Sequence, residues 1–372
     1  MRPTFALRFK TRTTMKKLLA PFAQGTLHLQ NHLVMAPMTR SRALHNVPNE
    51  LMATYYQQRA AAGLIITEGT APSPEGLGYS RIPGIFSEEQ VTGWRKVTEA
   101  VHTGGAKIFL QLMHTGRIAH TDNLPAGMQP VGMSNVRAAG EIYTDHHGPQ
   151  PHSQPVVLDA QGLSRVVEDY VQAARNAVRA GFDGVELHGA NGYLLEQALN
   201  PHVNTRTDTY GGSVENRSRL PLEVAARIAA AIGPERVGIR LSPFSTLSDM
   251  PAYDEAEVHR TYVHLSTELN RLGIAYLHIS DNPAIPAETH QALRQSFAGV
   301  LIYCNGLTVE TAEAKLQEGS ADLVAFGRNF LSTPDLVRRI EQNEPFNEVD
   351  YLTLYTAGPE GYTDYPVLAL VQ

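Results

Sequence analysis

The chain of 372 residues contains a single cysteine, Cys304. One cysteine excludes an internal disulfide and a cysteine-ligated iron–sulfur cluster, and it favours a cytoplasmic protein. No apolar run reaches the roughly 18 residues that a membrane span needs. The net charge is -6 and no basic cluster is interleaved with aromatic residues, so neither nucleic acid nor a membrane is an expected partner.

The motifs of several enzyme classes are also absent. No His-x-His pair is present, so a metal-dependent barrel hydrolase is not indicated and no metal is expected. None of the six lysines stands at the C-terminal end of an expected strand, which argues against a Schiff-base aldolase. No G-x-G-x-x-G motif follows a strand, so a Rossmann domain for a nicotinamide is not expected.

The first residues differ from the rest of the chain. Residues 1–14 are basic, lack acidic side chains and precede a second methionine, Met15. Transit peptides share this composition, but the segment is short and has no small-residue cleavage site. We therefore expect a disordered N-terminal extension or an upstream start codon over 1–14, followed by one folded domain over 15–372.

Short apolar and β-branched segments alternate with longer helical patterns along the chain. Strands that alternate with helices pair in parallel through right-handed crossovers. Eight such units favour an α/β fold of the closed (β/α)8 TIM-barrel type over an open doubly wound sheet. The expected strands are His32–Met38, Leu64–Thr67, Lys107–Leu112, Gly184–His188, Val237–Leu241, Ala275–Ile279, Val300–Cys304 and Leu323–Phe326. The expected helices are Asn49–Ala62, Ser87–Thr103, Ser164–Ala180, Val214–Ile232, Asp254–Leu272, Ala287–Phe297, Val309–Glu318 and Asp335–Glu341, and a long loop is expected from about His114 to Pro155.

The fourth expected strand ends in the most informative segment, His188-Gly-Ala-Asn191-Gly-Tyr193. Active-site groups of such barrels lie at the C-terminal ends of the strands. His188 and Asn191 are three residues apart, and we expect one helical turn to place them on the same side. Two neutral donors there suit a carbonyl or nitro oxygen, and Tyr193 suits a general acid. Singly, each residue also fits a structural role, as a core histidine, a turn asparagine or a packing tyrosine.

Other strand ends carry side chains that suit a polar heterocycle. Thr39 offers a hydroxyl, although it also fits a cap for the next segment. Gln111 offers both a donor and an acceptor, which suits the pyrimidine edge of a flavin. Arg240 must find an anionic or electron-rich partner in the barrel mouth, because burying its charge unpaired is costly. That partner is either a ligand or a barrel carboxylate such as Glu68 or Glu186.

The ends of the seventh and eighth expected strands resemble a phosphate site. Gly306 and Gly327 follow these strands and each opens a helix, as in the usual phosphate site of barrels. Arg328 adds a cationic fork for phosphate oxygens. Ordinary turn chemistry also explains each glycine. Together with the absences above, the pattern makes a phosphorylated cofactor such as FMN a good candidate.

Several spaced motifs, in the right order, resemble the Old Yellow Enzyme family. The match spans roughly Leu18 to Pro366 and is most similar to bacterial N-ethylmaleimide and nitrate-ester reductases. The motifs that carry it are Ala36–Arg40, Gln111–Arg117, His188–Leu194, Asn204–Arg217 and Glu360–Pro366.

The resemblance implies an FMN-dependent ene-reductase. NAD(P)H would reduce FMN, and flavin N5 would then deliver hydride to the β-carbon of an enone, maleimide or nitroalkene; nitrate esters are a further expected substrate class. His188 and Asn191 would bind the activating oxygen, and Tyr193 would protonate the α-carbon. Without a Rossmann domain, nicotinamide and substrate would share one mouth, which implies ping-pong turnover. The expected partners are small electrophilic alkenes, and the chain is expected to be a monomer or a homodimer.

Two alternatives stay open. Another FMN barrel, for example a dienoyl-CoA reductase, is disfavoured because those relatives carry a cysteine-ligated cluster and an extra dinucleotide domain. A non-catalytic flavin-binding protein is disfavoured because storage needs no proton donor such as Tyr193.

The resemblance also implies roles for individual residues. Met113 stands where relatives commonly carry tryptophan, so we expect a roomier site on that side. The implied cofactor-binding residues are Pro37, Met38, Thr39, Gly69, Gln111, Arg240, Asn305, Gly306, Leu307, Gly327 and Arg328. The implied substrate-binding residues are Tyr79, Met113, Phe244 and Tyr355.

Overall fold

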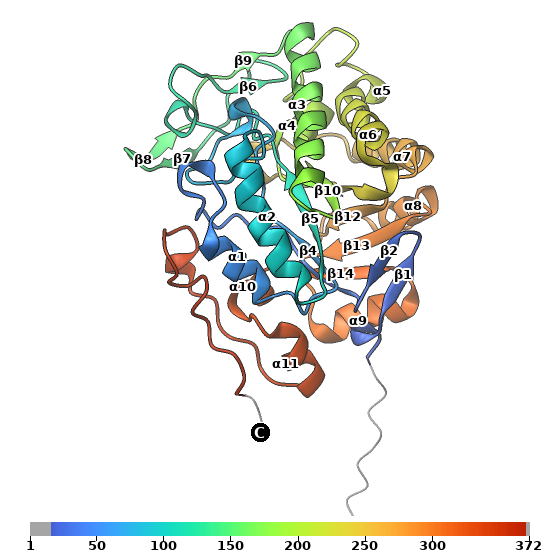
Figure 1. Cartoon of the computed structure of the whole chain (residues 1–372). Coiled ribbons are helices and arrows are strands. Elements are labelled where there is room, and N and C mark those ends of the chain that lie inside the picture. The colour runs from blue at the N-terminus through green and yellow to red at the C-terminus, as the bar shows by residue number, and fades with distance from the viewer. Residues whose placement is uncertain (1–15, 370–372) are drawn as a thin grey trace, which may run out of the picture.

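Eight parallel strands close into a barrel in the computed structural model, which describes residues 16–369 (Figure 1). Each strand pairs with the next along the chain, and β14 pairs with β3 to complete the ring. The predicted (β/α)8 barrel is therefore confirmed. The barrel strands are β3 (Leu33–Met35), β4 (Leu64–Ile66), β5 (Lys107–Leu112), β10 (Gly184–Gly189), β11 (Val237–Leu241), β12 (Tyr276–Ser280), β13 (Val300–Cys304) and β14 (Leu323–Phe326). The expected extension over 1–14 lies outside the described residues.

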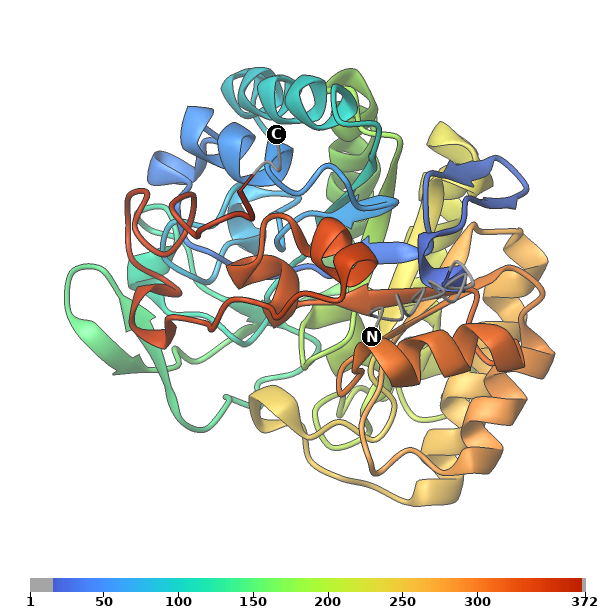
Figure 2. The ribbon, with the colours of Figure 1, turned by 90° about the horizontal axis from the view of Figure 1, so that it is seen from below.

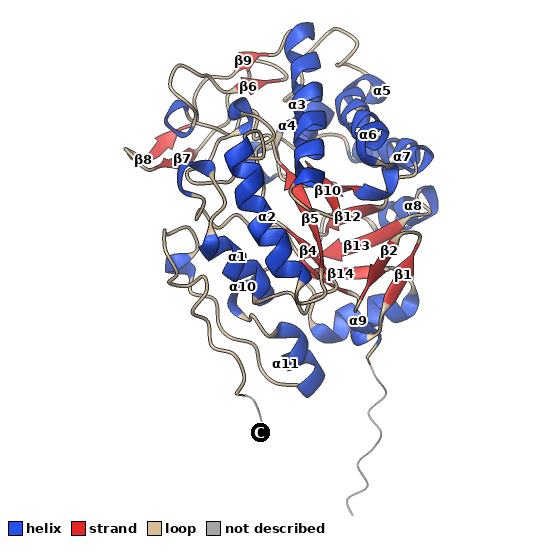
Figure 3. Ribbon diagram, in the orientation of Figure 1, coloured by secondary structure: helices blue, strands red, loops and turns tan. Residues whose placement is uncertain are grey.

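Helices surround the barrel strands on the outside (Figure 3). The longer ones among them, such as α2, α3 and α6, bury an apolar face against the strands, as amphipathic helices do. The α-helices are α1 (Glu50–Gln57), α2 (Glu88–His102), α3 (Ala160–Arg179), α4 (Leu194–Leu199), α5 (Val214–Arg217), α6 (Arg219–Ile232), α7 (Glu255–Leu272), α8 (Ala287–Ser296), α9 (Val309–Glu318), α10 (Arg328–Ser332) and α11 (Leu336–Gln342). Single-turn 3-10 helices cover Lys17–Leu19, Leu44–Asn46, Pro74–Gly76, Thr121–Asn123, Pro234–Arg236, Leu247–Asp249 and Tyr351–Thr353.

Helix boundaries differ from the expected ones where a cap decides them. Helix α3 begins at Ala160 rather than Ser164, because the Asp159 side chain accepts a hydrogen bond from the Gly162 amide and so satisfies one free donor of the first turn. The helix expected over 214–232 is two helices that meet at Ser218.

Two hairpins were missed. Strands β1 (Phe22–Gln24) and β2 (Leu27–Leu29) form an antiparallel pair whose leucines join a buried cluster of barrel residues, and Figure 2 shows this hairpin beside the strands. The loop expected from His114 to Pro155 contains a second hairpin, β7 (Glu141–Thr144) with β8 (Gly148–Pro151), which projects from the molecule in Figure 1. Two-residue strands β6 (Val131–Gly132) and β9 (Val156–Val157) pair at its base.

Buried arginines fasten the C-terminal segment to the barrel. Arg40 donates to the Gly361 carbonyl at 2.8 Å, and Arg42 donates to the Leu354 carbonyl at 2.7 Å. Arg59 donates to the Phe330 carbonyl at 2.7 Å. We call Arg40, Arg42 and Arg59 the arginine clamp.

Two classes of feature are missing from the part of the chain that the structure describes. None of its helices is long and apolar enough to cross a membrane. Among residues 16–369, no three His, Cys, Asp or Glu side chains gather closely enough to hold a metal ion.

Candidate active site

The carboxyl ends of neighbouring barrel strands bring the predicted polar residues together. In the parallel ladder, His188 of β10 stands opposite Arg240 of β11, and Arg240 stands opposite His278 of β12. On the other side of β10, Gln111 of β5 stands opposite Glu186. Side chains at opposed positions of parallel strands share one face of the sheet, so these residues form a continuous polar patch inside the barrel mouth.

His188 and Asn191 lie beside each other, but the expected helical turn does not exist. His188 is the penultimate residue of β10, and Asn191 follows in a left-handed turn with φ 58°, continued by Gly192 with φ 82°. His188 Nδ1 and Asn191 Oδ1 are buried without a hydrogen-bond partner. Burial, reinforced by the charge of Arg240, lowers the pKa of His188 well below its ordinary value, so the ring is neutral near pH 7. The pair therefore has free polar atoms and no formal charge.

Tyr193 is held as a neutral phenol. Its hydroxyl lies 3.0 Å from the hydroxyl of Tyr79, and its ring packs edge-on against His188 with centroids 4.7 Å apart. Burial raises the pKa of both tyrosines, so both keep their protons at neutral pH. A protonated phenol beside the His188–Asn191 pair has the chemistry of a general acid.

A cavity of about 920 Å³ opens over Tyr79 and Tyr193, whereas His188 and Asn191 are not among the residues that line it. The predicted residues Thr39, Tyr79, Tyr193 and Tyr355 line it together. Sequence reasoning missed the rest of its wall, much of which comes from the β7–β8 hairpin and the C-terminal segment, because loop residues far apart in the chain show no common pattern. The missed lining residues include Ile118, Ile142, Tyr143, His152, Tyr351 and Leu352.

Arg240 has no carboxylate partner among the described residues. Its Nη2 has only long contacts, 3.4 Å to Ser280 Oγ and 3.7 Å to Cys304 Sγ, and its Nε has no partner. Glu186, one of the two carboxylates considered from the sequence, instead accepts from Gln111 at 2.8 Å and lies 2.9 Å from His278 Nδ1.

The other carboxylate, Glu68, accepts from the backbone amide of Arg40 at 3.1 Å. A guanidinium that is 6% exposed with a free donor fits an anionic or electron-rich ligand edge, as the pyrimidine of FMN offers.

The expected phosphate residues follow paired strands. Cys304 of β13 stands opposite Ala325 of β14, so the turns after both strands lie side by side. Gly306 has φ 66° and is exposed, and Gly327 leaves 3.5 Å between an added Cβ and the Met38 sulfur. Arg328 is exposed at the same edge. Asn305 uses its side chain to bond Ser280 Oγ at 2.9 Å, and Leu307 is half-buried.

Pro37, Met38 and Thr39 leave β3 half-buried on the way to the mouth. Gly69 is required by close packing, because a Cβ there would lie 2.4 Å from the Met113 sulfur. Met113 itself is 1% exposed and packs beneath Tyr79 and Tyr193, and it is not one of the residues that line the large cavity.

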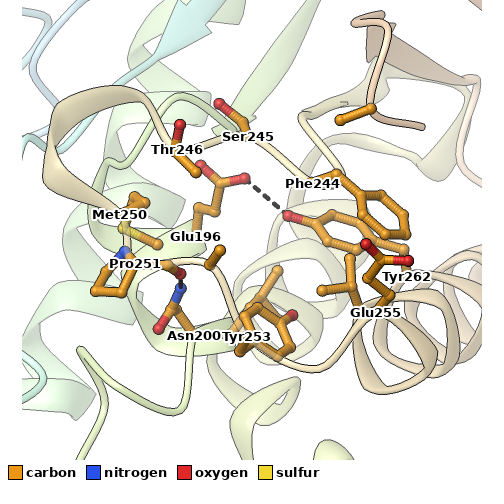
Figure 4. Close-up of a pocket in the computed structure, with 14 residues that line it drawn as sticks. Glu196, Asn200, Phe244, Ser245, Thr246, Met250, Pro251, Tyr253, Glu255 and Tyr262 are labelled. Atoms are coloured by element: carbon orange, nitrogen blue, oxygen red, sulfur yellow. Dashed lines mark hydrogen bonds between the residues drawn. The ribbon is translucent and has the colours of Figure 1, made fainter.

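Phe244 lies apart from the large cavity. Its φ of 61° turns it toward a second pocket of about 240 Å³, which it shares with Glu196 and Tyr262 (Figure 4). Sequence reasoning missed Glu196, although a glutamate three residues after Tyr193 is visible in the sequence.

Comparison with known proteins agrees with this geometry. The model of the NADH:flavin oxidoreductase / NADH oxidase family matches residues 17–347. The chain is 41% identical to 12-oxophytodienoate reductase 1 of Oryza sativa subsp. japonica, over 94% of this chain and 93% of that protein. Morphinone reductase in complex with tetrahydroNAD has 45% identity and a TM-score of 0.91, covering 95% and 98% of the two chains. The old yellow enzyme homologue from Zymomonas mobilis has 40% identity and a TM-score of 0.90, covering 95% and 100%.

Proposed function

The chain belongs to the NADH:flavin oxidoreductase / NADH oxidase family, the Old Yellow Enzyme family, and from this premise we propose that it reduces activated C=C bonds in enones, maleimides and nitroalkenes. It is an NAD(P)H-dependent oxidoreductase that uses FMN. Reduction of nitrate esters, and the finer relation to N-ethylmaleimide reductases, belong to the same proposal.

The polar groups of the barrel mouth fit FMN. When bound and reduced by the nicotinamide, FMN would supply hydride to the substrate. Arg240, with its free Nε, would hold the electron-rich edge of the isoalloxazine, and Gln111, fixed by Glu186, would meet the pyrimidine. Gly306, Gly327 and Arg328 would hold the phosphate on the turns after β13 and β14.

The observation that carries the proposed reaction is the pair of buried polar atoms without partners, His188 Nδ1 and Asn191 Oδ1. Buried polar atoms are almost always hydrogen-bonded, so unpaired ones at the barrel mouth indicate a ligand site. The Nδ1–H of neutral His188 and the side-chain NH2 of Asn191, rather than its acceptor Oδ1, would donate to the substrate oxygen and draw electron density from the double bond. The β-carbon then becomes electrophilic, and Tyr193 gives its hydroxyl proton to the α-carbon.

The alternative of a non-catalytic flavin-binding protein lacks support from this geometry. Flavin storage does not need a neutral tyrosine hydroxyl that a second tyrosine positions at 3.0 Å. The described residues form one barrel, and the catalytic groups lie at its mouth. The substrate and the nicotinamide would therefore use the same cavity in turn.

Replacing Tyr193 with phenylalanine tests the proposal. Tyr193→Phe should slow enone reduction about a hundredfold or more, because a positioned general acid contributes at least that much. Flavin reduction by NADPH needs no proton from Tyr193 and should stay within about twofold of the wild type, a margin far below that contribution. Stopped-flow absorbance of each half-reaction measures both rates. Equal slowing of the two half-reactions would show that Tyr193 shapes the cavity and is not the acid.

A further inference from the structure

A buried carboxylate stands behind the turn that carries Asn191 and Tyr193. Glu196 is the third residue of α4 and is 3% exposed. Helix α4 starts at Leu194, and Tyr193, which precedes it, provides no side-chain cap. The turn before α4 lies outside the helix, so its backbone amides need acceptors that the helix ladder does not supply.

Glu196 accepts hydrogen bonds from that turn directly and through a serine. Its Oε2 accepts from the Gly192 amide at 2.6 Å, and its Oε1 accepts from the Ser242 hydroxyl at 2.5 Å. The Ser242 oxygen in turn accepts from the Asn191 amide at 2.8 Å. The carboxylate thus holds two consecutive amides of the turn.

The turn needs this support because its backbone is in an unfavourable conformation. Asn191 has φ 58°, in the left-handed region that side chains other than glycine rarely adopt. Gly192 has φ 82° and packs so closely that an added Cβ would lie 2.7 Å from Ser248 Cβ. Such conformations persist only where surrounding contacts hold them. Without an acceptor at position 196, the Gly192 amide would lose its partner, and the Ser242 hydroxyl that accepts from the Asn191 amide would lose the acceptor that orients it.

The far side of Glu196 faces the small pocket of about 240 Å³ in Figure 4. The Tyr262 hydroxyl donates to Glu196 Oε1 at 2.7 Å from this side. The other titratable residues that line the pocket are Tyr253 and Glu255, and no lysine, arginine or histidine lines it. No cation compensates the carboxylate there, and burial raises the pKa of Glu196 to about 7 against the lowering effect of its three hydrogen bonds.

We propose that Glu196 is a positioning residue for the ene-reductase reaction: its carboxylate holds the 191–193 turn so that Asn191 meets the substrate oxygen and Tyr193 meets the α-carbon. The inference rests on the proposed function of that pair. The ionised carboxylate accepts all three donors, whereas the protonated group must donate one bond itself and so no longer matches them. Affinity for an oxygen ligand should therefore fall as pH drops through about 7.

Neither neighbour of the ligand titrates in that range. Burial keeps His188 neutral and Tyr193 protonated near pH 7. Glu68 also has a pKa raised by burial to about 7, but it belongs to the other side of the mouth, where it accepts from the Arg40 amide. A variant of Glu196 separates the two carboxyl groups.

The test is a phenol titration of the FMN-loaded enzyme from pH 5.5 to 8.5, read from the long-wavelength charge-transfer absorbance. Glu196→Gln should weaken phenol binding about tenfold at pH 8, the loss expected for one hydrogen bond to a charged group, and should abolish the change of affinity near pH 7. Glu255→Gln is the matched control, because Glu255 lines the same pocket but is exposed, and it should behave as the wild type.

Tyr262→Phe is a second variant that leaves the bonds to the turn in place. It removes one donor to Glu196, so the midpoint of the pH profile should move to higher pH. Wild-type phenol affinity and an unchanged pH profile in a folded Glu196→Gln protein would overturn the inference. Absence of any phenol band in the wild type would instead contradict the proposed oxygen site itself.

Discussion

The buried arginines of the arginine clamp and the buried Arg240 differ in their hydrogen bonds. In the arginine clamp, the Arg42 guanidinium donates to the carbonyls of Arg40, Leu354, Thr353 and Glu360 at 2.7 to 3.0 Å. In the barrel mouth, Arg240 donates no hydrogen bond shorter than 3.4 Å from its side chain to the described residues, and its Nε has no partner.

This difference distinguishes Arg42, a structural cation, from Arg240, whose free donors suit a ligand. Burial lowers the pKa of Arg42 to about 10, with the charge of Arg40 acting in the same direction, yet Arg42 stays charged at neutral pH and its donors are satisfied. Arg240 is desolvated by burial but lacks such partners. A bound group must therefore offset the cost of desolvating its guanidinium. Hydrogen-bond completeness, rather than burial, distinguishes the two roles.

The largest expected effect is the loss of stability when the arginine clamp is disrupted. Arg42→Met should lower the free energy of unfolding by about 3–5 kcal/mol, because buried carbonyls of the C-terminal segment lose a charged donor. Denaturant unfolding measures the change, and Arg271→Met, at an arginine that is 68% exposed, is the control that should lose little. A loss below about 1 kcal/mol, the net value of a single ordinary hydrogen bond, would contradict the structural role.

The next effect breaks the oxygen-binding pair in the mouth. His188→Ala should weaken phenol binding and slow enone reduction about a hundredfold, the usual cost of removing one donor at a developing negative charge. Its stability should change far less than that of Arg42→Met, because His188 Nδ1 has no protein partner to lose. Equilibrium titration and stopped-flow kinetics measure these effects, with His28→Ala, exposed on β2, as control. Unchanged phenol affinity would mean that the pair binds something else.

The smallest expected effect sharpens the contrast between the arginines. Arg240→Gln should weaken FMN binding about tenfold, as one charge-assisted hydrogen bond is lost, while the unfolding free energy of the flavin-free protein should not fall. Fluorescence of released FMN and denaturant unfolding of the apoprotein measure the two quantities. If the apoprotein loses as much stability as Arg42→Met, Arg240 is a structural residue and the comparison fails.

The barrel was predictable because each unit has local signals. Each barrel strand is a short run of mostly apolar and buried residues, as Val300–Cys304 is, so its sequence shows the pattern that identifies a strand. The hairpins β1–β2 and β7–β8 were missed because their short strands are partly exposed and lack the fully buried apolar run that β3 and β4 show. Helix α3 was placed too late because its start depends on one hydrogen bond of Asp159.

The site was predictable in part for the same reason. Residues at strand ends, such as His188 and Arg240, reach one mouth in any barrel of this type, so their positions follow from the strand assignments. The left-handed turn at Asn191 was not expected, because spacing in sequence does not specify the backbone conformation between two residues. Glu196 and the cavity wall from the β7–β8 hairpin were not expected either.

The sequence by itself thus determined the barrel, its order of strands, the family and the residue types gathered at the mouth, since these depend on local pattern and on motifs. Only the tertiary structure decided which of those groups have partners. Glu186 is hydrogen-bonded to Gln111 and His278, and Glu68 accepts from a backbone amide. Neither carboxylate pairs with Arg240. Hydrogen-bond satisfaction depends on distances of about 3 Å between residues far apart in the chain, and a linear pattern does not encode such distances.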